Sequence, residues 1–161
     1  NIGPLSRSTE KEIRSQWARC PDSGKEADIC KETKKAAIAV LESQGVFAEC
    51  STLPEITMGS CANIARAVLK RVAGVSVLQV GDGDHLWVEY NGVHYDAERP
   101  TGVSDYMQLP FFSRVPVEDM LVTARLAAEA EGREPPETIE DTVKDVTEQQ
   151  KQFIKDQEGN L

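Results

Sequence analysis

The sequence has few of the residues that bind nucleic acid or metal ions. Its 18 Lys and Arg are outnumbered by 27 Asp and Glu, which gives the 161-residue chain a formal net charge of -9 at pH 7. Nucleic acids and anionic membranes attract basic surfaces, so this balance argues against both as partners. The chain has only two histidines, and none of its four cysteines forms a Cys-x-x-Cys pair, which argues against a structural zinc site. We therefore expect neither a metal nor a cofactor.

Long hydrophobic runs are also missing. No apolar stretch approaches the ~18 residues of a membrane span, and no segment resembles the apolar part of a signal peptide. The chain begins with Asn1 rather than Met, so we expect a processed or engineered end, and the sequence leaves the compartment open. Internal repeats and low-complexity tracts are absent as well. The Gly- and Asp-rich stretch at 81–84 is too short for a calcium-binding loop and is expected to be a turn.

What is present is an ordinary globular composition, with 40% hydrophobic and 28% charged residues and enough length for a sizeable core. Hydrophobic periodicity and Gly or Pro breaks predict a mixed α+β fold. We expect a core at 1–116 and an acidic helical extension at 117–161, packed on or beside it. Helices are expected at 9–19, 25–44, 61–73, 117–131 and 137–157, strands at 75–80, 85–90 and 93–98, and irregular structure at 46–58 and 99–116.

The cysteines differ in their surroundings. Cys20 and Cys30 flank a turn-like Pro-Asp-Ser-Gly stretch, so they could close a small disulfide loop in an oxidising compartment or remain reduced. Both readings stay open. If Cys61 is catalytic, at least one of the other three cysteines has no partner within the chain.

Cys61 lies at the predicted start of an apolar helix, just after Ser60, a good N-cap residue. The positive end of the helix dipole favours a thiolate there, and the free backbone N–H groups can bind an oxyanion. The alternative is a small buried cysteine on the apolar stripe of the helix, which is the commoner fate of a lone cysteine.

Asn91 and Gly92 form the strongest short signal for a β-hairpin in the chain. A two-residue turn there pairs Glu89 with His94 and places side chains alternately on two faces. One face is apolar (Leu86, Val88, Tyr90, Val93, Tyr95 and Ala97), and the other carries His85, Trp87, Glu89, His94, Asp96 and Glu98. His85 and Asp96 become diagonal neighbours on the polar face, close enough for their side chains to meet. The alternative is that this face is simply solvated.

A thiol, an imidazole and a carboxylate in this order are the parts of a cysteine nucleophile, its base and its orienting group. The segment from Gly59 to Pro100 moreover resembles the core of the transglutaminase-like superfamily, a branch of the papain-like cysteine enzymes. The resemblance is carried by a Gly-x-Cys at a helix start, an Ala four residues on, an Arg late in the helix, a Gly with a β-branched residue before a strand, a His-x-Trp-x-Glu strand and a later Asp. These residues are Gly59, Cys61, Ala65, Arg71, Gly74, Val75, His85, Trp87, Glu89 and Asp96.

The resemblance implies a papain-like α+β core in which the Cys-bearing helix packs on a small antiparallel sheet. It implies that Cys61 is the nucleophile, His85 the general base and acid, and Asp96 the orienting group. Members of the superfamily include crosslinking transglutaminases, deamidases, peptidases and amidases, so the fold does not select the substrate. Large calcium-dependent members carry modules for which this chain shows no counterpart.

Several residues leave alternatives open. His94 is a second candidate for the base, Glu98 is a second candidate for the orienting group, and Trp87 either walls the substrate cleft or covers the sheet. Trp17, Gln44 and Asn63 have side chains of the type that could complete an oxyanion hole.

The leading hypothesis is a thiol-dependent hydrolase, a peptidase, amidase or deamidase, that acts on an amide of a protein or peptide. The alternatives are a catalytically silent scaffold that binds a protein partner, through the C-terminal helix or the segment 99–116, and a crosslinking acyltransferase.

Overall fold

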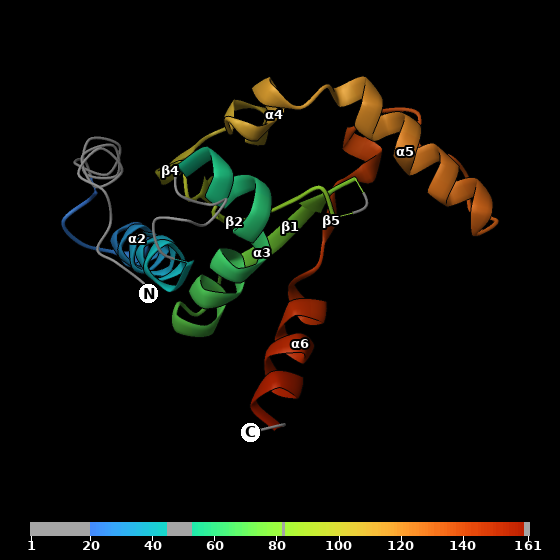
Figure 1. The fold of residues 1–161 in the computed structure, drawn as a ribbon. Helices are drawn as coiled ribbons and strands as arrows, with labels where there is room; N and C mark the ends of the chain where they lie inside the picture. The colour runs from blue at the N-terminus through green and yellow to red at the C-terminus, as the bar shows by residue number, and fades with distance from the viewer. Residues whose placement is uncertain (1–19, 45–52, 82, 160–161) are drawn as a thin grey trace.

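The fold was analysed in a computed structural model, which describes residues 20–44, 53–81 and 83–159 (Figure 1). It is an α+β fold with a small antiparallel sheet, as expected. The expected helix at 9–19 lies outside the described residues. The helices are α2 (Lys25–Gln44), α3 (Leu53–Arg71), α4 (Phe111–Arg114), α5 (Val117–Ala130) and α6 (Thr147–Gly159), with short 3-10 turns η2 (Tyr106–Gln108) and η3 (Glu140–Thr142). The strands are β1 (Ser76–Val80), β2 (His85–Tyr90), β3 (Val93–Asp96), β4 (Arg99–Val103) and β5 (Lys144–Asp145).

The sheet has the strand order β4-β3-β2-β1-β5, and all its neighbours are antiparallel. The hairpin register predicted from the sequence is confirmed: Val88 pairs with Tyr95, Glu89 with His94, and Tyr90 with Val93. Asn91 and Gly92 have φ angles of 53° and 77°, the left-handed pair that a type I′ turn requires. This local turn therefore sets which side chains of β2 and β3 share a face.

Each face of the sheet is covered by a hydrophobic cluster. On one face, α2 and α3, which lie together in Figure 1, pack on the strands; the buried residues there are Ile29, Ala65, Val68, Val72, Val75, Val77, Leu86, Val88, Tyr95 and Val146. On the other face, the segment from Leu109 to Met120 covers Val80 and Trp87; its buried residues are Leu109, Phe111, Phe112 and Met120. The hairpin face predicted to be polar is thus part of a second core, and only His94 and Glu89 on it remain partly exposed.

Three predicted elements differ from the structure. Residues 53–58 are helical although Pro54 lies among them, because proline is tolerated in the first turn of a helix. Residues 99–103 form β4 despite Pro100, because β4 is an edge strand, where a missing N–H costs little. Residues 137–157 do not form one helix: they contain η3, β5 and most of α6.

The C-terminal segment is joined to the sheet through hydrogen bonds to backbone groups of β1 and of Gly81. The N–H of Val146 donates to the carbonyl of Val77 at 2.8 Å, and the N–H of Val77 donates to Thr147 Oγ1 at 2.9 Å. Gly81 N–H donates to Thr142 Oγ1 at 3.1 Å. The segment predicted as an extension packed on or beside the core contributes the edge strand β5 and core side chains such as Val146.

Cys20 and Cys30 form a disulfide at the start of α2, with their Cα atoms 6.0 Å apart. The sequence left open whether these two cysteines form a disulfide or remain reduced, and the structure contains the disulfide. Cys50 lies outside the described residues. Among the described helices, none is long and apolar enough to cross a membrane.

Candidate functional site

Cys61 lies where α3 bends. Ser60 leaves the helical conformation, with φ -133° and ψ 18°, and regular helix resumes at Cys61. The predicted helix start at this cysteine is therefore present as a kink within a longer helix. The Cys61 thiol is free and its residue is partly exposed, packing against the first hydrophobic cluster. The kink places the thiol at the N-terminal end of the second half of α3, the end toward which the backbone N–H groups of a helix point.

His85 is the first residue of β2, and its side chain is completely buried. Its Nε2 lies 3.1 Å from Oδ2 of Asp96, the last residue of β3. The imidazole ring stacks on Phe111, with the ring centroids 4.6 Å apart. The carboxylate and the stacked ring together hold the imidazole in one orientation, so the diagonal meeting predicted from the hairpin register is present.

The second carboxylate oxygen of Asp96 is held by the turn between β3 and β4. Oδ1 accepts hydrogen bonds from the backbone N–H of Glu98 at 3.0 Å and of Arg99 at 2.9 Å. Asp96 is 5% exposed. The backbone thus fixes the plane of this carboxylate, and Oδ2 is left to face His85.

The thiol and the imidazole alter each other's ionisation. Burial alone would raise the pKa of Cys61, but hydrogen bonding and charge from His85 and the backbone N–H groups of Leu86 and Ala62 lower it below its usual value. Burial alone would lower the pKa of His85, but the hydrogen bonds and charges of Asp96 and Cys61 raise it to about 9. Both shifts favour a thiolate next to an imidazolium.

The Nδ1 atom of His85 is buried and makes no hydrogen bond of good geometry with the described residues. Because Nε2 is occupied by Asp96, Nδ1 is the ring nitrogen left for the thiol. Cys61 and His85 line the same small cavity, which places the thiol beside the imidazole. Such contacts often tighten only when a substrate binds.

The two alternative residues have other partners. Glu98 is 6% exposed, and both of its carboxylate oxygens accept hydrogen bonds from Arg114. His94 Nδ1 accepts a hydrogen bond from Trp87 Nε1 at 3.0 Å, and burial lowers the pKa of His94. Asp96, rather than Glu98, therefore contacts His85, and His94 is engaged on Trp87.

Trp87 is 1% exposed and lies in the second hydrophobic cluster. A side chain buried to this extent covers the sheet, which is the second of the two roles considered for it. It also lines a cavity of about 10 Å³ beside Cys61, His85 and Asp96. This space is too small to hold a side chain, and of the three residues only Cys61 is partly exposed.

Sequence reasoning missed three groups at this site. The stacked ring of Phe111, the guanidinium of Arg114 and the N–H of Leu86 all act on the three residues or their neighbours. Phe111 and Arg114 come from the segment 99–116, for which irregular structure was expected. The only sequence signal for packing there was the aromatic pair of Phe111 and Phe112. Of the oxyanion candidates, Asn63 accepts a hydrogen bond from Arg66 at 2.7 Å, whereas Trp17 and the side chain of Gln44 lie outside what the structure describes.

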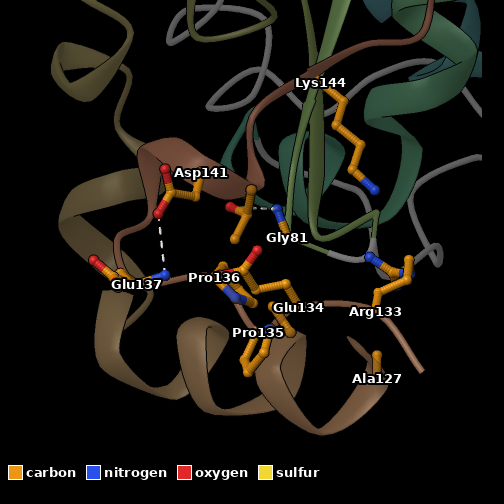
Figure 2. A pocket seen from close by; sticks show the side chains of 11 residues that line it. Gly81, Ala127, Arg133, Glu134, Pro135, Pro136, Glu137, Asp141 and Lys144 are labelled. Atoms are coloured by element: carbon orange, nitrogen blue, oxygen red, sulfur yellow. Dashed lines mark hydrogen bonds between the residues drawn. The ribbon is translucent and has the colours of Figure 1, made fainter. Parts of the chain in front are cut away.

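A larger cavity of about 340 Å³ lies elsewhere, between α5, the segment 133–137 and the ends of β1 and β5 (Figure 2). None of the three residues lines it, and Figure 2 shows it bordered by charged groups such as Arg133 and Lys144. Across the described residues, no three His, Cys, Asp or Glu side chains converge as a metal site would require.

A scan against protein-family models found no match for the chain, and searches of curated proteins and of solved structures found none either.

Proposed function

We propose that the protein is a thiol-dependent hydrolase that attacks an amide carbonyl of a protein or peptide. Cys61 is the nucleophile, His85 the general base and acid, and Asp96 the group that orients the imidazole. The observation that carries the proposal is the buried contact between His85 Nε2 and Asp96 Oδ2, which leaves Nδ1 for the thiol. A transglutaminase-like relationship is part of the same proposal and rests on the sequence motif.

The reaction follows from the ionisation of the pair. The Cys61 thiolate adds to the amide carbonyl, and the carbonyl oxygen takes up the negative charge. Backbone N–H groups at the kink, including that of Cys61, are donors for this oxyanion. The imidazolium of His85 gives its Nδ1 proton to the leaving amine as the C–N bond breaks, which leaves a thioester on Cys61.

Water completes the hydrolysis. His85, now neutral, takes a proton from a water molecule that attacks the thioester carbonyl. The C–S bond breaks, a carboxylic acid leaves, and the thiolate and imidazolium are restored. Asp96 keeps its hydrogen bond to Nε2 throughout and stabilises the positive charge of the ring. A peptide bond as substrate makes the protein a peptidase, and a glutamine or asparagine side chain makes it a deamidase.

Alkylation of Cys61 tests the proposal without a known substrate. In a Cys50→Ser background with the Cys20–Cys30 disulfide intact, Cys61 is the remaining free thiol. We expect iodoacetamide to react with it well below pH 8, because only the thiolate is nucleophilic. A further Cys61→Ala change should abolish labelling, and His85→Ala should move the reaction toward the free-thiol pKa of about 8.5. A rate that rises only near that value in the parent contradicts the proposal.

The products assign the reaction type. Incubation of the parent and the Cys61→Ala variant with glutamine-containing peptides separates three outcomes. New amino termini identify a peptidase, released ammonia with intact peptides identifies a deamidase, and incorporation of an added primary amine identifies an acyltransferase.

A second candidate is a catalytically silent scaffold that binds a protein partner. Val122 and Leu126, four residues apart on α5, are 52% and 62% exposed, which favours a protein contact on that helix. This candidate predicts an ordinary Cys61 thiol in the alkylation experiment and no turnover.

A further inference from the structure

The guanidinium of Arg66 is held rigidly between α3 and α6. Its Nη2 donates to Asn63 Oδ1 at 2.7 Å, its Nη1 donates to Gln150 Oε1 at 3.0 Å, and its Cζ lies 4.1 Å from the centre of the Phe153 ring. Two side chains from α6 thus fix a cation that is carried by the helix of Cys61. Three such contacts restrict the side chain to one orientation.

All three partners of Arg66 are electrically neutral. Two are amide oxygens and one is an aromatic face, and within the described residues no carboxylate pairs with this guanidinium. Burial lowers the pKa of Arg66, which shows that its charge is partly removed from water. A half-buried cation with neutral partners gains free energy when an anion binds next to it.

Arg66 borders open space. A cavity of about 490 Å³ lies between α3 and α6, lined among others by Asn63, Arg66, Ala67 and Phe153. The nearest other charges in its wall are Lys70 and Glu158, which form an ion pair with 2.7 Å between Nζ and Oε1. Because that pair is internally neutral, the guanidinium gives the cavity its net positive charge.

The position of Arg66 relative to Cys61 sets the distance at which it can act. It follows Cys61 by five residues in the regular part of α3, which corresponds to about 7.5 Å along the helix axis and about 140° around it. Because the two side chains leave different faces of the helix, an extended peptide needs more than the roughly two residues of the axial span to join them. The charges of the two groups also interact, since the thiolate raises the pKa of Arg66 against the effect of burial.

We propose that Arg66 is a specificity-determining residue that binds a carboxylate of the substrate, a few residues away from the amide that Cys61 attacks. The inference rests on the proposed function of Cys61. The carboxylate belongs either to an acidic side chain or to the C-terminus of a peptide. Asn63, Gln150 and Phe153 are positioning residues that aim the guanidinium, which gives the C-terminal helix a role in substrate choice.

Two alkylating reagents of similar size and different charge test the electrostatic part. The ratio of the iodoacetate rate to the iodoacetamide rate at Cys61 reports the local charge that an anion meets. In the Cys50→Ser background, we expect Arg66→Gln to lower this ratio at least about twofold, as the loss of one cation at this distance predicts. Arg66→Lys should retain most of the ratio. Lys151→Gln, which removes the same charge from α6 without contacting Arg66, is the matched control and should leave the ratio unchanged.

Protection experiments then identify the source of the carboxylate. The alkylation of Cys61 by iodoacetamide is measured with N-acetylglutamine, which has a free α-carboxylate, and with N-acetylglutamate α-amide, which has only a side-chain carboxylate. Slower alkylation with the first identifies a C-terminal carboxylate, and with the second an acidic side chain. Neutral N-acetylglutaminamide is the control, and protection by a carboxylate should be lost in Arg66→Gln.

The two proposals fail in different ways. Equal protection by the neutral compound, or a rate ratio that Arg66→Gln leaves unchanged, overturns the role of Arg66 even when Cys61 is highly reactive. A Cys61 that reacts only as an ordinary thiol overturns the proposed function, and the rate ratio still measures the charge at Arg66 separately.

Discussion

Nε2 of His85 lies 3.1 Å from Oδ2 of Asp96, and the contact is closed from solvent because the two side chains are 0% and 4% exposed. The backbone N–H groups of Glu98 and Arg99 hold the other oxygen of this carboxylate. A carboxylate fixed in this way stabilises the protonated imidazole and leaves its second nitrogen free for proton transfer.

Replacing the carboxylate with an amide tests this relationship. Asp96→Asn keeps the shape of the side chain but removes the charge that raises the pKa of His85. We expect the alkylation profile of Cys61 to move upward by at least about one pH unit, with a rate at neutral pH at least about tenfold lower. Glu98→Gln is the matched control, since Glu98 contacts Arg114 rather than His85. Equal shifts of the alkylation profile in Asp96→Asn and Glu98→Gln would show that Asp96 is not the residue that orients His85.

The pKa values of the two histidines should differ widely. His85 has a pKa raised to about 9, whereas burial lowers the pKa of His94 below 6.5. Because the chain contains no other histidine, ring signals in an NMR titration can be assigned with one variant, His94→Gln. In Cys61→Ala, the pKa of His85 should fall, since the thiolate no longer raises it. Two titrations close to 6.5 would be incompatible with the buried pair.

The same shifts predict how stability depends on pH. Between pH 6.5 and about 8.5, the unfolded chain keeps its Cys61 proton and loses that of His85, while the thiolate–imidazolium pair of the proposed function does the reverse. The numbers of bound protons then match, and these two groups give the free energy of unfolding almost no slope. Cys61→Ala leaves only His85, whose raised pKa stabilises the native state below pH 6.5. Its stability should therefore fall as pH rises from 6.5 to the pKa of His85 in this variant, which lies below that of the parent, by up to about 1.4 kcal/mol per pH unit.

Chemical denaturation at several pH values measures these slopes. The informative quantity is the difference between Cys61→Ala and the parent, because the other titrating groups are common to both. A slope that is the same in the two proteins would mean that the parent has no ion pair in this range.

The hairpin could be predicted from sequence because its information is local. The two residues at 91–92 fix the turn, the turn fixes the register, and the register brings His85 to Asp96. The helix of Cys61 could be predicted for a similar reason, since its apolar spacing is a property of consecutive residues. In both cases the energetic preference operates within a few residues along the chain.

The segment 137–157 could not be predicted in this way, because its structure depends on distant partners. Its apolar residues at helical spacing belong to different surroundings: Val143 packs against the second cluster, Val146 lies in the first, and Phe153 contacts Arg66. Pairing of β5 with β1 joins residues 67 positions apart, as in the contact of Leu78 with Asp145. The partners of the site from the segment 99–116 were missed for the same reason.

The ion pair between Glu98 and Arg114 should be important for stability. The Glu98 side chain is 7% exposed, and Arg114→Ala would leave its carboxylate buried without this partner. We expect a loss of about 2–4 kcal/mol in the free energy of unfolding, measured by denaturant titration. Arg133→Ala removes an exposed pair with Glu131 and should change stability by less than about 1 kcal/mol. Equal effects of the two variants would show that the burial of Glu98 does not determine the loss in the free energy of unfolding.

Two glycines with similar φ angles allow the cost of backbone strain to be measured separately from the cost of steric overlap. Gly102 in β4 has φ +88°, and an added Cβ would lie 2.5 Å from Val93 Cγ1 and 2.7 Å from Tyr95 Cε2. Gly92 has φ +77° with nothing within 4 Å of an added Cβ. Gly92→Ala should therefore cost only the left-handed backbone, about 1–2 kcal/mol. Gly102→Ala should cost about 1–3 kcal/mol more, because Tyr95 lies in the packed core and cannot move freely. Since Tyr95 is next to Asp96, the larger loss should come with slower alkylation of Cys61 at neutral pH, and Gly92→Ala should leave that rate unchanged.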